Sequence, residues 1–470
     1  MTTIFSRYNK ENLRIGKYAG MMGCWIALLL GGCDSFVEVD VPSSQLTTTA
    51  VFQDKATAEA ALLDIYAKIR DTGMLFGDLP GISNALGNYT DELVSYGSAS
   101  DVSQGFYTNN LMPSNATVNA WWSSAYSQIY AANLLIEGLT ASTSISQPDK
   151  AKLRGEALFI RGLLHFYLAN IYGDVPYITT TDYRQNRQVN RTAVTNVYQA
   201  VITDLGEAAE LLAEPSAEQR IRANKATVIA LLARVYLYAG KYPEAADCAS
   251  YLINNNTLYS LEAPGGAFLE DSRETIWHLM PQNQGQNTRE GAAFIFIAGP
   301  PQQVALSNSL IDAFEPGDLR RANWVNAVSD GSSTWYHAYK YKERGNTASS
   351  LEYSVLLRLA EQYLIRAEAR AMQGDLIGAK DDVDKIRFRA GLGNTPAETQ
   401  AEILDAILKE RQVELFTETG HRFFDLKRSG YLDQVLTPVK TGWESTDRLL
   451  PLPENELLLN PNLSPQNPGY

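Results

Sequence analysis

The chain has 470 residues, of which 45% are apolar and 20% are charged, which indicates a globular protein of about three domains or one large helical array. Its 53 aspartates and glutamates outnumber 40 lysines and arginines, giving a formal net charge of −13, so the composition argues against a nucleic-acid partner. Three cysteines and four scattered histidines argue against a disulfide scaffold and a metal centre, and we predict no metal and no cofactor.

The N-terminus has the layout of a bacterial export signal. Basic residues up to Lys17 precede the apolar run Met21–Leu30, which is shorter than the roughly 20 residues that a membrane-spanning helix needs. The segment Leu30–Cys33 then resembles a lipobox, the site at which a bacterial lipoprotein is lipidated and cut. We therefore predict that residues 1–32 are a lipoprotein signal peptide, that Cys33 carries the lipid anchor, and that residues 33–50 are a tether to one body over 51–470.

Helical periodicity dominates the body. Apolar residues recur at spacings of three and four through 153–171, 228–238 and 356–367, so we predict a mainly α fold. Two segments repeat a pattern of Ala, Gly and Ala at spacings of seven and five, at Ala233 to Ala245 and Ala367 to Ala379. This pattern is typical of tetratricopeptide-like helix pairs, in which small residues let two helices approach, and we place such pairs at about 150–255 and 355–392.

Two stretches, about 72–117 and 254–350, interrupt this periodicity. They are rich in Gly, Asn, Ser, Gln and aromatic residues, and we predict that they are long irregular excursions from the helical scaffold. Loops of this length inside a compact protein usually carry function, so we expect the ligand-binding region there.

Motifs of enzyme chemistry do not occur in the sequence. It contains no phosphate-binding loop ending in Lys-Ser or Lys-Thr, no Gly-x-Ser-x-Gly, no His-Glu-x-x-His and no Cys-x-x-Cys. We therefore predict no catalytic residue. A pair of loop carboxylates that hydrolyses a glycosidic bond stays open as an alternative, because one sequence shows no distances.

Four stretches together resemble the SusD/RagB family of outer-membrane nutrient-uptake lipoproteins, and the resemblance spans essentially the whole mature chain. Their Arg and Glu residues look structural, since such pairs form bidentate ion pairs between helices. The stretches are 154–176, which ends in Tyr-Gly-Asp-Val-Pro; 357–392, around Arg358 and Glu361; 410–430, around Glu410, Glu414 and Arg422; and the proline-rich end 450–470.

This resemblance implies a SusD-like fold and a non-enzymatic protein that captures a nutrient, most often a glycan. It also implies a SusC-like TonB-dependent transporter as partner, which imports the captured ligand. The protein would then be lipid-anchored in the outer membrane and face outward. A RagB-like peptide-binding protein, a lipid-anchored glycosidase and a purely structural scaffold are the alternatives.

Candidate ligand residues follow from the chemistry of sugars, whose apolar faces stack on aromatic rings and whose hydroxyl groups bond to amides. We predict that Trp324 and Trp335 are stacking platforms, with Tyr96 or Tyr107 opposite, and we exclude Trp121 and Trp122 as core residues because of their helical spacing. The remaining candidates are two tyrosines of the second stretch and three amides: Tyr336, Tyr339, Asn88, Asn109 and Gln282.

Overall fold

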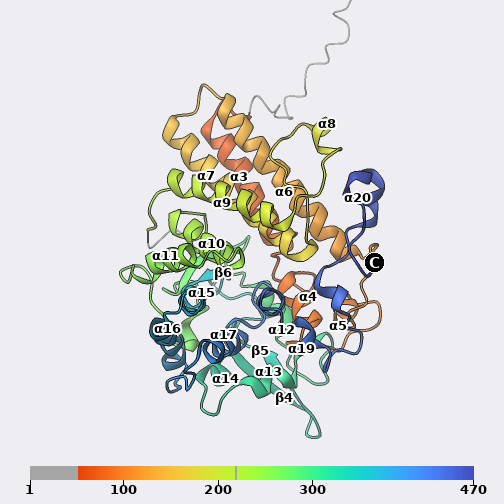
Figure 1. Ribbon diagram of the computed structural model, residues 1–470, viewed down its shortest axis with the longest axis vertical. Coiled ribbons are helices and arrows are strands. Elements are labelled where there is room, and N and C mark those ends of the chain that lie inside the picture. The colour runs from red at the N-terminus through yellow and green to blue at the C-terminus, as the bar shows by residue number, and fades with distance from the viewer. Residues whose placement is uncertain (1–50, 217–219) are drawn as a thin grey trace, which may run out of the picture. The chain divides into compact units, whose positions relative to one another are not determined.

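The computed structural model describes residues 51–216 and 220–470 (Figure 1). The predicted signal peptide, the lipidation site Cys33 and the tether therefore lie outside the described residues. In the part of the chain that is described, no helix is long and apolar enough to cross a membrane.

Long helices form the first part of the body, as the periodicity predicts. They are α3 (Lys55–Asp71), α6 (Ala116–Ala141), α7 (Gln147–Tyr172) and α9 (Val194–Leu211), and α7 packs against both α6 and α9. α6 begins where the side chain of Asn115 accepts the backbone N–H groups of Thr117 and Val118, at 3.0 and 3.1 Å. α7 ends at Gly173, whose φ of 78° favours glycine.

Both predicted Ala-Gly-Ala hairpins are present. α10 (Lys225–Tyr238) pairs with α11 (Tyr242–Ile253), and α15 (Leu359–Met372) pairs with α16 (Leu376–Arg389), with Gly240 and Gly374 turning the chain at φ values of 69° and 85°. The alanines allow close packing between the hairpins, because Ala245 of α11 shares a buried cluster with Ala369 of α15. α17 (Gln400–Leu415) packs on α15 and α16.

Short elements fill the stretches between and after the long helices. The α-helices are α4 (Ile82–Tyr89), α5 (Val102–Tyr107), α8 (Tyr183–Asn186), α12 (Arg289–Phe294), α13 (Asn308–Ala313), α14 (Leu319–Trp324), α18 (His421–Ser429), α19 (Leu432–Leu436) and α20 (Glu454–Leu459). The 3-10 helices are η2 (Pro264–Gly266), η3 (Ser445–Arg448) and η4 (Pro461–Leu463).

The two irregular stretches meet in one antiparallel sheet, which the sequence did not predict. β1 (Leu93–Ser95) comes from the first stretch, and β3 (Val304–Leu306), β5 (Thr334–Ala338) and β4 (Val325–Ser329) come from the second, in the order β1-β3-β5-β4. β2 (Thr275–Leu279) and β6 (Ser354–Arg358) pair separately. Figure 1 shows β4 and β5 beside α13 and α14. The sheet therefore positions the loops in which we expect the ligand.

Candidate functional site

One face of the four-stranded sheet is buried in a hydrophobic core. Leu93 of β1 pairs with Leu306 of β3, and Leu306 pairs with Tyr336 of β5, so these three side chains lie on the same face. Leu93 and Leu306 belong to the cluster that contains the fully buried Trp324 and Phe268, and the partly buried Tyr336 packs against it. This face of the sheet is therefore closed to a ligand.

The opposite face carries aromatic and amide side chains. Alternation along the strands places Trp335 and His337 of β5 on this face, next to Asn326 of β4, which pairs with His337. The same alternation places Tyr96, directly after β1, on this face, and its backbone N–H donates to the carbonyl of Gln303 at 2.7 Å. Tyr96 is 41% exposed, and Asn326 is also exposed.

A loop after α12 extends this face. The ring of Phe296 lies 5.0 Å from the ring of His337, which in turn lies 5.6 Å from the ring of Tyr339. Ile297, the next residue of the loop, is 78% exposed. We call the group Tyr96, Phe296, Ile297, Trp335 and Tyr339 the aromatic surface.

His337 supports the aromatic surface from below and is not poised for acid–base chemistry. It is buried, its Nδ1 lies 3.0 Å from the carbonyl oxygen of Ala338, and burial lowers the pKa of its imidazole. The ring is therefore neutral at physiological pH. Among residues 51–216 and 220–470, no group of three or more His, Cys, Asp or Glu side chains is placed to hold a metal ion.

The prediction that Trp324 is a stacking platform is wrong. Its side chain is fully buried, and its Nε1–H donates to the carbonyl of Pro264 at 2.6 Å. Cations cover the ring, with the Nζ of Lys340 5.0 Å and the guanidinium carbon of Arg389 5.2 Å from its centre. Trp324 is a core residue that joins the sheet to the ion pairs beneath it.

The predictions for Asn88 and Asn109 are also wrong, because both side chains are buried around α4. The amide of Asn88 donates to the carbonyl and side-chain oxygens of Asn84, at 2.9 and 3.0 Å. The amide of Asn109 donates to the carbonyl of Tyr89 at 3.0 Å. Both amides therefore brace the backbone of the first stretch instead of facing a ligand.

The remaining predicted residues divide between the aromatic surface and other places. Tyr96, Trp335 and Tyr339 lie on the aromatic surface. Tyr336 faces the core side, and the guanidinium carbon of Arg321 lies 4.8 Å from the centre of its ring. The Nζ of Lys440 lies 3.9 Å from the centre of the Tyr107 ring. Gln282 is exposed at a separate polar pocket of about 200 Å³.

Sequence reasoning missed Phe296, Ile297, Asn326 and Gln303. The available signal was the alternation of Trp335, His337 and Tyr339, which places every second residue on one face of a strand. The neighbours of that face come from positions up to about 240 residues away and depend on the register of the sheet, which the sequence alone does not supply.

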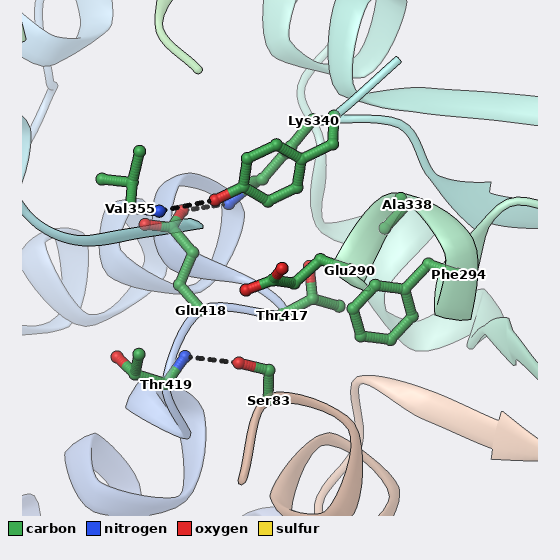
Figure 2. Close-up of a pocket in the computed structure, with 11 residues that line it drawn as sticks. Ser83, Glu290, Phe294, Ala338, Lys340, Val355, Thr417, Glu418 and Thr419 are labelled. Atoms are coloured by element: carbon green, nitrogen blue, oxygen red, sulfur yellow. Dashed lines mark hydrogen bonds and ion pairs between the residues drawn. The ribbon is translucent and has the colours of Figure 1, made fainter. Parts of the chain in front are cut away.

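A small cavity on the core side of the sheet is too small for a nutrient. Figure 2 shows Glu290, Thr417 and Glu418 around it, with the backbone N–H of Thr419 donating to the hydroxyl of Ser83 at 2.9 Å. Its volume of about 10 Å³ is roughly that of one water molecule. Burial raises the pKa of the Glu290 carboxyl, which accepts a hydrogen bond from Ser354 at 2.7 Å.

Comparison with known proteins identifies the family. Residues 37–237 match a family model described as "Starch-binding associating with outer membrane", and residues 320–470 match one described as "SusD family". A SusD-like protein of Bacteroides ovatus is 31% identical over 73% of this chain and 72% of its own length. The chain belongs to the SusD family.

Other SusD-family proteins match nearly the whole chain. SusD-like protein P2 of Formosa agariphila is 27% identical over 95% of this chain and 98% of its own length. A SusD superfamily protein of Bacteroides vulgatus has a solved structure with a TM-score of 0.77 and 22% identity, covering 89% of this chain and 99% of that one. A solved laminarin-binding SusD-like protein has a TM-score of 0.72 and 24% identity, covering 89% of this chain and all of that one (100%). These structures establish the SusD-like, mainly α fold.

The SusD-family motifs lie beneath the aromatic surface and hold the scaffold together. Arg358 of β6 forms ion pairs with Glu274 at 2.7 Å and with Glu414 of α17 at 2.6 Å. Arg320 of α14 reaches Glu410 and the same Glu414 at 2.8 and 3.1 Å. All five side chains are buried. As predicted, the Arg and Glu residues of these motifs form buried ion pairs between separate elements of the scaffold.

Proposed function

We propose that this protein binds a glycan on the aromatic surface without cleaving it. The observation that carries the proposal is the arrangement of Tyr96, Phe296 and Trp335 with Gln303 and Asn326 on and beside the face of one sheet that is turned away from the hydrophobic core. Flat rings next to amides match the apolar faces and hydroxyl rims of sugars. A rigid sheet holds these groups in place, so little ordering cost accompanies binding.

The relatives support this ligand class. One matching family model is described as starch-binding, and a structural neighbour is described as laminarin-binding. Both are neutral glucans, so stacking and hydroxyl contacts suffice to recognise them. The aromatic surface of this chain offers the same kinds of contact.

The proposed role continues with delivery of the glycan to a SusC-like TonB-dependent transporter. The lipobox at Cys33 and the family description, which mentions association with the outer membrane, support a lipid-anchored protein at the cell surface. Immunoprecipitation of the protein from its own membranes tests this step. A co-purified outer-membrane barrel supports delivery, and recovery of the protein alone from mild detergent contradicts it.

Binding to a panel of neutral and acidic glycans and of peptides tests the ligand class. We expect retardation of the protein in gels that contain one glycan family, followed by saturable binding in calorimetry. The size of the glycan before and after incubation tests for hydrolysis, and an unchanged size is expected. Binding of peptides alone would favour the RagB-like alternative, and shortening of the glycan would favour a glycosidase.

A further inference from the structure

A second polar pocket lies beside the aromatic surface and has a different character. It is the pocket of about 200 Å³ at which Gln282 is exposed. It is lined by the end of α3, the segment after β2, the start of α12 and the segment 344–346. We call it the arginine pocket, because Arg70, Arg289 and Arg344 line it.

The charge of the arginine pocket is opposite to that of the chain. Its lining contains three arginines and one aspartate, Asp71, and a second carboxylate, Asp78, lies 3.9 Å from Arg289, which leaves an excess of one positive charge, whereas the whole chain has a net charge of −13. Against such a background, a local positive field attracts anions selectively.

The three arginines differ in how far they are already neutralised. Arg70 is fully engaged, since its Nε donates to Asp71 at 2.8 Å and a second ion pair of 2.5 Å joins the two side chains. Arg289 is 51% exposed and lies 3.9 Å from both Asp71 and Asp78, at the outer limit of an ion pair. Arg344 is exposed and forms no ion pair or hydrogen bond within residues 51–216 and 220–470. Arg289 and Arg344 therefore retain donors for a ligand.

The loops that carry these donors are held in place before any ligand binds. The amide of Asn287 donates to the carbonyl of Gly345 and the hydroxyl of Thr347, both at 2.9 Å, and its oxygen accepts the backbone N–H of Leu351 at 2.8 Å. Gly285 accepts the backbone N–H of Thr347 at 2.8 Å. These hydrogen bonds join the segments 283–287 and 345–351 and fix the backbone beside Arg344. Binding of an anion there therefore costs little loop entropy.

Two short stretches of the chain connect the arginine pocket to the aromatic surface. α12 begins at Arg289 in the pocket and is followed by Phe296 on the aromatic surface, and its six residues span roughly 9 Å. The other connection runs from Tyr339 to Arg344, five positions later. A glycan chain of a few sugars can therefore contact both places.

We propose that the arginine pocket binds an oxyanion group of the glycan, a carboxylate or a sulfate ester, and so makes the protein selective for acidic glycans. This inference rests on the proposed function and names the class of its ligand. Arg344 and Arg289 supply forked N–H donors that match the planar carboxylate or the sulfate oxygens, and Gln282 and Asn346 supply neutral donors at the rim.

Calorimetry of the protein as the cell makes it, extracted in detergent, tests the proposal. The probes are a tetrasaccharide of galacturonic acid, its uncharged methyl ester, a sulfated tetrasaccharide, a neutral glucan of similar length and an acidic peptide. We expect one or both anionic sugars to bind at least about tenfold more tightly than the uncharged sugars. The preference should shrink as salt rises from 50 to 500 mM, while binding of the uncharged sugars stays constant.

Variants tie the preference to the pocket. Arg344→Gln and Arg289→Gln should each reduce the preference about tenfold without changing affinity for the uncharged sugars. Arg344→Lys should retain part of it, because a lysine keeps the charge but loses the fork. Arg187→Gln, which removes an exposed arginine beside α8, is the matched control and should have no effect.

Four results would overturn the proposal. Equal affinity for charged and uncharged sugars, or an unchanged preference in both glutamine variants, would reject the arginine pocket and leave the proposed glycan function intact. Binding of the acidic peptide alone, or of no probe in the set, would reject the proposed function as well.

Discussion

The indole ring of Trp335 lies directly over Gly299. An ideal Cβ on Gly299 would be 2.2 Å from Cζ3 and 2.3 Å from Cε3 of the Trp335 ring, so any larger residue there must displace the indole. The absence of a side chain at position 299 therefore sets the position of the ring on the aromatic surface.

A Gly299→Ala variant tests whether the position of this ring matters. We expect glycan affinity to fall about tenfold, since the added methyl group displaces the indole from its place over Gly299, while the free energy of unfolding changes by less than about 1 kcal/mol. Calorimetry and urea denaturation measure the two quantities. Gly206→Ala in α9, where an added Cβ meets nothing within 4 Å, is the control and should bind normally. Full affinity in Gly299→Ala would show that the indole tolerates displacement.

Trp324 should behave in the opposite way to a ligand residue. It is fully buried and its Nε1–H is bonded to Pro264, so Trp324→Ala leaves a cavity and an unpaired carbonyl. We expect a loss of about 3 to 5 kcal/mol in the free energy of unfolding, with residual folded protein that still binds glycan. Urea denaturation followed by circular dichroism gives the first value. A variant as stable as the natural protein would contradict the burial of this ring.

The buried carboxylate of Glu414 should be among the most important charges for stability. It forms ion pairs with Arg358 at 2.6 Å and Arg320 at 3.1 Å, and also with Arg389, and these three cations hold its pKa well below the usual range. Glu414→Gln removes the negative charge but keeps the shape of the side chain. Each of the three arginines then loses one ion-pair partner. We expect destabilisation of about 3 to 5 kcal/mol by chemical denaturation. Glu398→Gln, on an exposed side chain, should change little; equal effects of the two substitutions would refute the network.

Lys440 should make stability depend on pH. Burial lowers the pKa of its ammonium from 10.5 to about 7, and its Nζ donates to the carbonyl of Asn88 at 2.6 Å. Between pH 7 and 10.5 the unfolded chain therefore binds a proton that the folded protein has lost, so this residue's contribution to stability rises with pH across that window. Below pH 7 the lysine is protonated in both the folded and the unfolded state, so the full free-energy cost of burying its charge then opposes folding.

The Lys440→Met variant isolates this effect. The free energy of unfolding of the natural protein minus that of the variant should increase by a few kcal/mol as the pH is raised from 7 to 10, measured in matched denaturant titrations. A difference that stays constant, or that decreases with rising pH, would show that burial does not lower the pKa of the Lys440 ammonium.

The helical scaffold was predictable from sequence because its information is local. The spacing of Ala233, Gly240 and Ala245 describes a helix, a turn with positive φ and a second helix that packs closely on the first. The sheet was not predictable in this way, since its strands are three to five residues long and β1 pairs with β3 more than 200 residues later. Short strands owe their existence to such distant partners.

The candidate site was predicted only in part for the same reason. Trp324 and Trp335 lie eleven positions apart in one aromatic-rich stretch, and their composition does not distinguish them. The difference arises because Trp324 ends α14 inside the core, whereas Trp335 of β5 is half-buried on the face of the sheet that is turned away from that core. Asn88 and Asn109 were likewise chosen by residue type, but tertiary packing around α4 buries both.

Calorimetric titration of the natural protein and of Trp335→Ala with the glycan selected from the panel tests the central claim most directly. We predict saturable binding by the natural protein and an affinity at least about tenfold weaker in Trp335→Ala, with both proteins equally stable. Tyr183→Ala, which removes a tyrosine that is 70% exposed on α8, should bind like the natural protein. Equal affinities for Trp335→Ala and the natural protein would contradict the assignment of the glycan to the aromatic surface.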